Sequence, residues 1–527
     1  MKAGFRGADP ERRREHQNMT LGRRIATWVQ NIRYEDLPDS TIHEVKRRVI
    51  DSLATCLGAY HSNPGVVARA QAMSVKVPPR GGATVWGTTH RTTPDLAAFA
   101  NGAMVRYLDY NDTYLSLEPA HPSDNLSAAV AVTQANRRTG RDLILAAVIG
   151  YELQCRMCDA DSLRKSGWDH VVYGAVSTAM LAGKLWGLNE DQLEHALGVA
   201  GVCNIATRQT RTGQISDWKA CAFSNAARNG VFAADLARRG LTGPFEIFEG
   251  PKGWMKQLSV PGLRDLVLAP DGRFMIDRTY IKYWPAEYHS QSAIDACLQL
   301  RPHFAGRDIT SILIKSFEAA VSIIGSEPEK LRPTSRETAD HSMFYCCAAA
   351  LVDGDVTLAT FDEDRLTDPR LLSLIDRTRI VEDPELNKGY PKGIPNDITI
   401  TCADGTVAAR RVDFPRGHAE NPMTDDEVVA KFRRLADGVI RDKEADRILK
   451  LCWKLDTLKD VTPLFAFKVM TKSNRGGAAA KRGPKAGRAL KSGKPAKRGE
   501  ASRGRSSKGA KTKPAAPSAR TKSKRSR

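Results

Sequence analysis

The chain has 527 residues, of which 41% are hydrophobic, and its formal net charge is +20 at neutral pH. This length allows two domains with substantial cores. The charge is uneven: residues 472–527 hold 20 lysines and arginines against one acid, Glu500, whereas the rest holds 60 basic and 59 acidic residues. The body is therefore nearly neutral, and its net charge gives no support to a nucleic-acid-binding surface there.

The N-terminus and the cysteines indicate the compartment. Residues 1–18 are polar and arginine-rich and lack the apolar stretch of a secretory signal. No run approaches the roughly 18–20 apolar residues of a membrane span. The ten cysteines are scattered and too sparse for a disulfide framework. We therefore expect a soluble, cytoplasmic protein without a membrane partner.

The pattern over 20–275 predicts a large all-helical domain, preceded by a flexible N-terminus at 1–19. Apolar residues recur at helical spacing over 20–60, and the run Ala83–Trp86 has β character. Alanine and glycine dominate the helix faces farther along and permit close packing. Five such helices are predicted, at 123–138, 141–160, 171–187, 190–206 and 220–239.

Residues 276–424 predict a smaller α+β domain. Ile309–Phe317 alternates like a strand, 397–415 has the pattern of a hairpin, and Glu337–Val352 is a strong helix. A last helical pattern, Asp425–Leu451, predicts that 425–455 packs back onto the helical domain. Residues 472–527 contain almost no large apolar side chain and are expected to be disordered. The predicted fold class is thus mainly α, with two domains and a basic tail.

The sequence does not contain the common metal and nucleotide motifs. Cys155 and Cys158 form a CxxC, but it lies within a predicted helix and has no second pair at zinc-ligand spacing, so core filling is the simpler interpretation. There is no G-x-x-x-x-G-K-[ST], no strand–GxGxxG–helix unit and no G-x-S-x-G. We predict no metal and no cofactor.

The stretch 107–125 concentrates ionisable side chains between two apolar helical patterns. It holds Asp109, Thr113 and His121, and prolines flank the histidine. An acidic surface loop with a chance histidine is the alternative interpretation. Other ionisable groups stand at the ends of apolar helices, where several elements can converge on a cavity. The resulting candidate acid/base set is Asp109, Thr113, His121, His170, Lys219, Lys282 and Tyr345, although each of these alone also suits a capped, solvated or core residue.

Several motifs together resemble the MmgE/PrpD family, which includes 2-methylcitrate dehydratase and cis-aconitate decarboxylase. They are Leu-Asp-Tyr-Asn-Asp-Thr at 108–113 with His-Pro-Ser at 121–123, Gly-Tyr-Glu at 150–152, Gly-Trp-Asp-His at 167–170, Gly-Lys-Leu-Trp-Gly-Leu at 183–188, and Gly-Leu-Thr-Gly-Pro at 240–244. The resemblance covers roughly 20–455, and the segments 282–292 and 338–342 look most like the 2-methylcitrate dehydratase branch. Asn111 departs from the family pattern, since many relatives have an acid there.

The resemblance implies a large helical domain, a smaller α+β domain, an active site in the cleft between them, and a homodimer. It places Asp109, His121, His170, Lys219, Lys282 and Tyr345 at the active site. Thr113 and His289 are expected to bind substrate.

The implied reaction is a metal-independent dehydration of 2-methylcitrate or a similar hydroxy-tricarboxylate. Because such a site must hold carboxylates and stabilise added negative charge, Arg208 and Arg211 are expected to clamp substrate. His121 or His170 would carry the proton, and Asp109 would orient an imidazole or a lysine.

Other functions stay open on sequence grounds. Decarboxylation of a cis-aconitate-like acid, or epimerisation of a related polycarboxylate, would use similar groups. A family member without catalytic activity is a third possibility. The tail at 472–527 also suggests nonspecific contact with nucleic acid or another polyanion.

Overall fold

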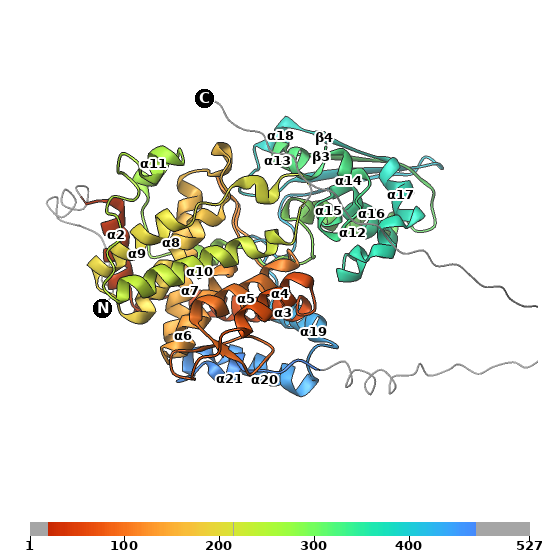
Figure 1. Cartoon of the computed structure of the whole chain (residues 1–527). Helices are drawn as coiled ribbons and strands as arrows, with labels where there is room; N and C mark the ends of the chain where they lie inside the picture. Colours follow the sequence, from red (N-terminus) through yellow and green to blue (C-terminus); the bar gives the residue numbers. More distant parts are fainter. Residues whose placement is uncertain (1–18, 214, 471–527) are drawn as a thin grey trace, which may run out of the picture. The chain divides into compact units, whose positions relative to one another are not determined.

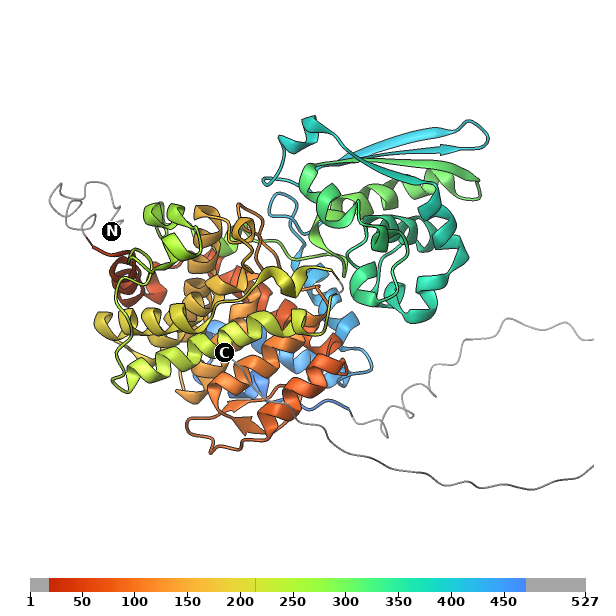
Figure 2. The same cartoon turned by 45° about the horizontal axis from the view of Figure 1, so that its top comes forward.

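Two separate hydrophobic cores form in the chain, one among helices and one beneath a sheet. The computed structural model describes residues 19–213 and 215–470, which fall within one compact unit. The predicted disordered tail at 472–527 and nearly all of the predicted flexible segment at 1–19 lie outside the described residues. The predicted fold class is otherwise confirmed: a mainly helical protein with a large helical part and a smaller α+β part (Figures 1 and 2).

The first core is built by helices from both ends of the described chain. They are α2 (Leu21–Asn31), α3 (Asp39–Gly58), α4 (Asn63–Met73), α5 (Pro94–Tyr107), α6 (Leu126–Ala135), α7 (Gly140–Ala160), α8 (Val171–Trp186), α9 (Glu190–Cys203), α10 (Trp218–Arg238), α11 (Trp254–Gln257), α19 (Asp425–Ala436), α20 (Asp442–Trp453) and α21 (Thr462–Phe465). In Figure 1 the blue C-terminal helices lie beside the red and orange N-terminal ones. Apolar residues of α19 and α20, including Phe432 and Ile448, belong to the same core as those of α3.

Small residues let the central helices approach closely. α8 is buried at nearly every position, and it packs against α10. A Cβ atom added to Gly230 of α10 would lie 2.0 Å from the Oγ1 atom of Thr178 and 2.5 Å from the carbonyl oxygen of Ala175. These close approaches explain why the faces are rich in alanine and glycine.

Gly230→Ala is expected to destabilise the protein by about 1–3 kcal/mol, because the added methyl group forces α8 and α10 apart. The free energy of unfolding, measured by urea titration, tests this. Gly22→Ala is the matched control, since a Cβ atom there meets nothing closer than 3.6 Å and alanine favours the helix. Equal midpoints for the two variants would contradict the close packing.

The second core lies beneath a four-stranded sheet in the order β4-β3-β5-β6. The strands are β3 (Ile309–Ser316), β4 (Thr378–Glu382), β5 (Asn396–Cys402) and β6 (Val407–Val412), and only β3 and β4 are parallel. Alternate residues of β5 are buried, as a sheet with one covered face requires. The short pair β1 (Ala83–Thr84) and β2 (Arg91–Thr92) lies apart from it.

Helices cover one face of this sheet, and α12 contacts both β5 and β6 (Figure 2). The helices of this part are α12 (Gln291–Phe304), α13 (Glu318–Ile324), α14 (Pro328–Leu331), α15 (Arg336–Ala339), α16 (Met343–Asp353), α17 (Pro369–Asp376) and α18 (Pro384–Asn387). None of the helices in the described residues combines the length and the hydropathy that a membrane span requires.

Two predicted helices are interrupted, which corrects the sequence-based expectation. The helix expected over 337–352 is divided into α15 and α16, because Ser342 caps α16 by accepting a hydrogen bond from the amide of Tyr345. The helix expected over 425–451 is divided into α19 and α20. Gly438 stands between them with a φ of +68°, a conformation that a continuing helix does not allow. The first interruption places a histidine in the site described next.

Candidate active site

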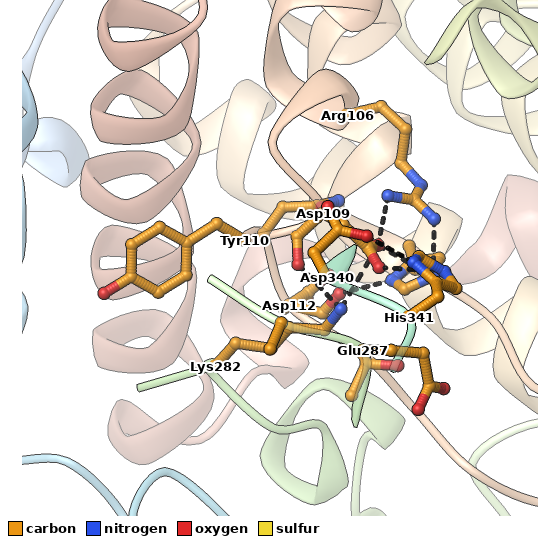
Figure 3. A network of polar contacts seen from close by, with 12 residues as sticks. Arg106, Asp109, Tyr110, Asp112, Lys282, Glu287, Asp340 and His341 are labelled. Carbon is orange, nitrogen blue, oxygen red and sulfur yellow. Dashed lines mark hydrogen bonds and ion pairs between the residues drawn. The ribbon is translucent and has the colours of Figure 1, made fainter. Parts of the chain in front are cut away.

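Asp109 is the centre of a group of charged side chains from both parts of the fold (Figure 3). Arg106, one turn earlier on α5, contacts its Oδ1 atom. The Nζ atom of Lys282 lies 3.2 Å from the same oxygen. The Nζ atom of Lys219, in the first turn of α10, lies 3.8 Å from the Oδ2 atom, and the Nε2 atom of His341 lies 3.5 Å from it. Three cations therefore surround one carboxylate.

Burial and charge act in opposite directions on this carboxylate. Burial alone would raise the pKa of Asp109, but Arg106, Lys219 and Lys282 hold that pKa well below its usual value. Burial also lowers the pKa of Lys219, against the attraction of Asp109, which raises it. Asp109 has a φ of +50°, in the left-handed region that costs energy for a residue with a side chain. Such strain at a buried charged group is typical of functional sites.

His341 is a site residue that the sequence reasoning did not select. It lies in the interruption between α15 and α16, and its Nδ1 atom contacts the Asp340 carboxylate. Its Nε2 atom is 3.0 Å from the Nζ atom of Lys219. An Nδ1–H donated to Asp340 leaves the Nε2 lone pair free to accept from the ammonium. The signal in the sequence was the Asp340-His341-Ser342 triplet, in which serine is a common N-cap.

His121 and His170 lie close to each other, with their ring centroids 5.9 Å apart, and the Nε2 atom of His121 is 4.0 Å from the Oδ1 atom of Asp109. The Nδ1 atom of His121 is 2.8 Å from the carbonyl oxygen of Asp112, so this nitrogen carries the proton. Its Nε2 atom then accepts from Arg106 at 3.0 Å. Burial, aided by Arg106 and Lys282, lowers the pKa of His121 well below its usual value.

His170 stands at the N-cap position of α8, and its Nδ1 atom is buried with no hydrogen-bond partner in the described structure. Burial and the cation of Arg211 lower the pKa of His170 to about 3. Both His121 and His170 are therefore neutral near pH 7. A neutral imidazole is able to accept a proton.

The two candidate clamp arginines, Arg208 and Arg211, lie on one 3₁₀ turn at 208–211. The Nε atom of Arg211 is 3.0 Å from an oxygen of Asp169, the residue before His170. Burial lowers the pKa of Arg208, and the Glu118 carboxylate opposes this effect. Arg211 is thus placed beside the histidines through Asp169.

Three further predicted site residues, Tyr345, Thr113 and His289, form no hydrogen bond or ion pair with Asp109 in the described structure, and the same is true of His170, Arg208 and Arg211. Tyr345 donates its hydroxyl hydrogen to the carbonyl oxygen of Thr360, at 2.8 Å, because the rotation of α16 directs the ring into the second core. Thr113 donates to the carbonyl oxygen of Ala120 within its own loop. These side chains have structural partners instead.

His289 is the third of these predicted site residues that do not contact Asp109. Its Nδ1 atom lies 2.7 Å from an oxygen of Glu287. Burial would raise the pKa of Glu287, but the imidazole of His289 lowers it to about 2. The amide of Glu287 donates to the carbonyl oxygen of Asp340, at 2.8 Å, so this pair borders the site without touching Asp109.

Only part of the group is open to solvent. The side chains of His121, His341 and Lys219 are 14%, 13% and 9% exposed, whereas those of Asp109 and Lys282 are 2% and 1% exposed. An incoming anion would therefore meet imidazole and ammonium groups first. Across the described residues, no set of three or more histidine, cysteine, aspartate or glutamate side chains is arranged to hold a metal ion.

The arrangement suits acid/base chemistry on an anion. Fixed cations stabilise negative charge that develops in a water-poor site, and neutral imidazoles next to them can take up a proton. Arg106 and His341 join the residues that the sequence indicated.

Comparisons with known proteins identify the family of the chain. The MmgE/PrpD N-terminal domain matches residues 23–263, and the MmgE/PrpD C-terminal domain matches 284–455. The chain is 33% identical to a 2-methylcitrate dehydratase of Cupriavidus necator over 64% of this chain and 74% of that protein. It is 28% identical to a cis-aconitate decarboxylase-like protein of Aspergillus oryzae over 84% and 96% of the two chains, and 26% identical to the cis-aconitate decarboxylase of Mus musculus over 84% and 91%.

The two matches run in order along most of the residues that build the two cores, and Lys282 lies in the short gap between them. The interruption between them, at 264–283, is where the chain passes from the first core to the second. On these grounds the chain belongs to the MmgE/PrpD family.

Proposed function

We propose that this protein is a metal-independent lyase that dehydrates 2-methylcitrate or a similar hydroxy-tricarboxylate. The observation that carries the proposal is the surplus of positive charge around Asp109, where Arg106, Lys219 and Lys282 converge on a single carboxylate. Such a surplus is suited to a substrate with several carboxylates. The 2-methylcitrate dehydratase of C. necator and its relatives support this substrate class.

In this proposal the histidines move the proton. Dehydration removes a proton from a carbon next to a carboxylate, and the electrons of that C–H bond form the C=C bond while the C–O bond to the hydroxyl group breaks. His170, whose Nδ1 atom has no hydrogen-bond partner in the described structure, or His121, whose Nε2 atom would first give up its hydrogen bond from Arg106, would accept the carbon-bound proton. Lys219, joined to His341, would donate a proton to the departing hydroxyl group, which leaves as water. Lys282 and Arg106 would stabilise the negative charge that develops on the carboxylate.

Decarboxylation of a cis-aconitate-like acid is the second candidate, and one observation favours it. The chain aligns with more of the decarboxylase-named proteins, 96% and 91% of their lengths, than with the C. necator dehydratase. In that reaction a C–C bond breaks to release CO₂, and an acid of the same site protonates the carbon. The same residues would serve both reactions.

The test is to incubate the full-length protein with a panel of tricarboxylates that includes 2-methylcitrate and cis-aconitate. Dehydration is followed by the ultraviolet absorbance of the new alkene, and decarboxylation by released CO₂. We expect alkene formation from 2-methylcitrate. Release of CO₂ from cis-aconitate without alkene formation from 2-methylcitrate would establish the second candidate, and no turnover of any acid would contradict both.

His170→Asn is the control that assigns the activity to this site. Asparagine cannot accept the carbon-bound proton, so the rate is expected to fall by about 10²-fold or more if His170 is the base. Circular dichroism checks that the variant is folded. A folded variant with the wild-type rate would remove His170 from the mechanism and leave His121 as the base.

A further inference from the structure

Lys431 is a buried lysine on α19 whose ammonium group joins three separate parts of the chain. Its Nζ atom donates to the carbonyl oxygen of Tyr110 at 2.7 Å and to the carbonyl oxygen of Lys282 at 2.8 Å. It also lies 2.6 Å from the Oδ1 atom of Asp51 on α3. The side chain is only 2% exposed. A lysine this deeply buried is costly unless it is paired and its hydrogen bonds are made.

Two of these contacts flank the catalytic group. Tyr110 directly follows Asp109, and Lys282 is the ammonium that contacts the Asp109 carboxylate. Lys282 in turn donates to the main-chain carbonyl oxygen of Asp109, at 2.8 Å. The consecutive carbonyls of Asp109 and Tyr110 are thus each bound by a lysine. These contacts hold the peptide orientation at Asp109, where φ is +50° and the chain would otherwise relax to a less strained conformation.

A second side chain of α19 supports the same connection. Arg434, one turn after Lys431, donates to the Tyr110 hydroxyl oxygen at 2.6 Å, and that hydroxyl donates to the carbonyl oxygen of Tyr283 at 2.6 Å. The Lys431 ammonium also stands 3.8 Å from the centre of the Tyr110 ring. In Figure 3 this ring points away from Asp109. Side chains of α19 therefore hydrogen-bond both to the loop after α5 and to the segment at 282–283, and they link these two parts of the chain.

We infer that Lys431 is a positioning residue. It holds Asp109 and Lys282 in the relative position that catalysis requires. It touches none of the reacting groups through its own charge, since its contacts are to main-chain carbonyls and to Asp51. The inference rests on the proposed lyase function for its kinetic readout. Displacement of a catalytic pair by about 1 Å is enough to cost about 10²-fold in rate, so loss of Lys431 is expected to lower kcat far more than it raises KM.

The competing explanation is that Lys431 only stabilises the fold. Lys431→Met removes the ammonium and leaves the Asp51 carboxylate buried without its cation, which destabilises a protein whatever its mechanism. A second variant, Asp51→Asn with Lys431→Met, removes both charges together. Replacing both partners of a buried ion pair restores much of the stability, but it does not restore the two hydrogen bonds to the carbonyls of Tyr110 and Lys282.

The experiment compares unfolding midpoints, kcat and KM for the full-length wild-type protein and three variants. Lys431→Met is expected to lose both stability and about 10²-fold in kcat. The double variant is expected to recover stability while its kcat stays low. Lys46→Met with Asp456→Asn is the matched control, because this pair also joins α3 to a C-terminal element, with 2.7 Å between the Lys46 Nζ atom and an Asp456 oxygen, and it is expected to keep the wild-type kcat.

A double variant that is stable and has the wild-type kcat would overturn the positioning role. A crystal structure of that variant gives a readout that needs no substrate. We expect the contact between Lys282 and the Asp109 carboxylate to lengthen from 3.2 Å and the φ of Asp109 to leave the left-handed region. An unchanged contact and φ would also overturn the inference. If the wild-type protein turns over none of the tricarboxylates, the proposed function fails, and the crystal structure still decides the role of Lys431.

Discussion

Asp109→Asn is expected to abolish measurable turnover and to lower the free energy of unfolding by about 3–5 kcal/mol. The substitution keeps the shape of the side chain but removes the one negative charge that Arg106, Lys219 and Lys282 share. Breaking a buried charge pair from one side costs about this much, because Lys219 and Lys282 stay buried without the carboxylate that they contact and Arg106 keeps only Asp124, at 3.9 Å. Turnover is expected to stop because the ammonium groups of Lys219 and Lys282 repel each other and lose the carboxylate that holds both in position.

The measurements for Asp109→Asn are denaturant unfolding and initial rates on the tricarboxylate that the wild type uses. Asp446→Asn is a matched control, since Asp446 pairs with Arg433 at 2.7 Å but is 61% exposed. A surface pair of this kind contributes about 0–1 kcal/mol, and wild-type activity is expected. If Asp109→Asn unfolded at the wild-type midpoint with the wild-type rate, the central role of this carboxylate would be wrong.

Lys219→Ala is expected to reduce the rate by about 10²-fold or more, with a smaller loss of stability than Asp109→Asn causes. Lys219 contacts both His341 and Asp109 from the more exposed side of the group, where substrate charge would develop. Removal of one preorganised donor or cation has this effect on rate. Stability changes less because Arg106 and Lys282 still pair with Asp109, and because burial already lowers the pKa of Lys219.

The control for Lys219→Ala is Lys184→Ala, on α8. Lys184 donates to the carbonyl oxygen of Gln30 at 2.7 Å, and burial lowers its pKa as well. It therefore shares with Lys219 a pKa that burial lowers, although its side chain is less buried, and it lies outside the Asp109 group. We expect the wild-type rate from Lys184→Ala. Equal rates for the two variants would show that the Lys219 charge does not act on the transition state.

The helices of the first core could be predicted from the sequence because their capping residues and apolar periodicity are local features. Thr139 and Asp142 form a capping box at the start of α7, and Asn189 and Gln192 form another at the start of α9. The apolar periodicity between such caps does not depend on distant partners. The same holds for the β5–β6 hairpin, where Gly405 has the positive φ that its turn requires. The sequence by itself also indicated that Asp109, His121, His170, Lys219 and Lys282 stand at element ends.

Tertiary packing decided which of these side chains meet and which others join them. Arg106 and Lys431 occupy helix positions that a sequence pattern cannot distinguish from solvated ones, and only the contact of α5 and α19 with the loop after Asp109 buries them. Tyr345 was expected in the site, but each helical residue turns the side-chain direction by about 100°, so a helix start shifted by the Ser342 cap directs the ring toward Thr360.

The sequence alone therefore determined the family, the mainly helical class and the neighbourhood of the chemistry, because these depend on short-range patterns and motifs. The tertiary structure alone decided that Asp340 pairs with His341 and that two lysines hydrogen-bond to the consecutive carbonyls of Asp109 and Tyr110. It also decided that Tyr345 does not contact Asp109. These features depend on contacts between residues as far apart as Tyr110 and Lys431. Such contacts form because a buried charge needs a partner. The partners can lie anywhere in the sequence, so these contacts produce no regular spacing that could be recognised in it.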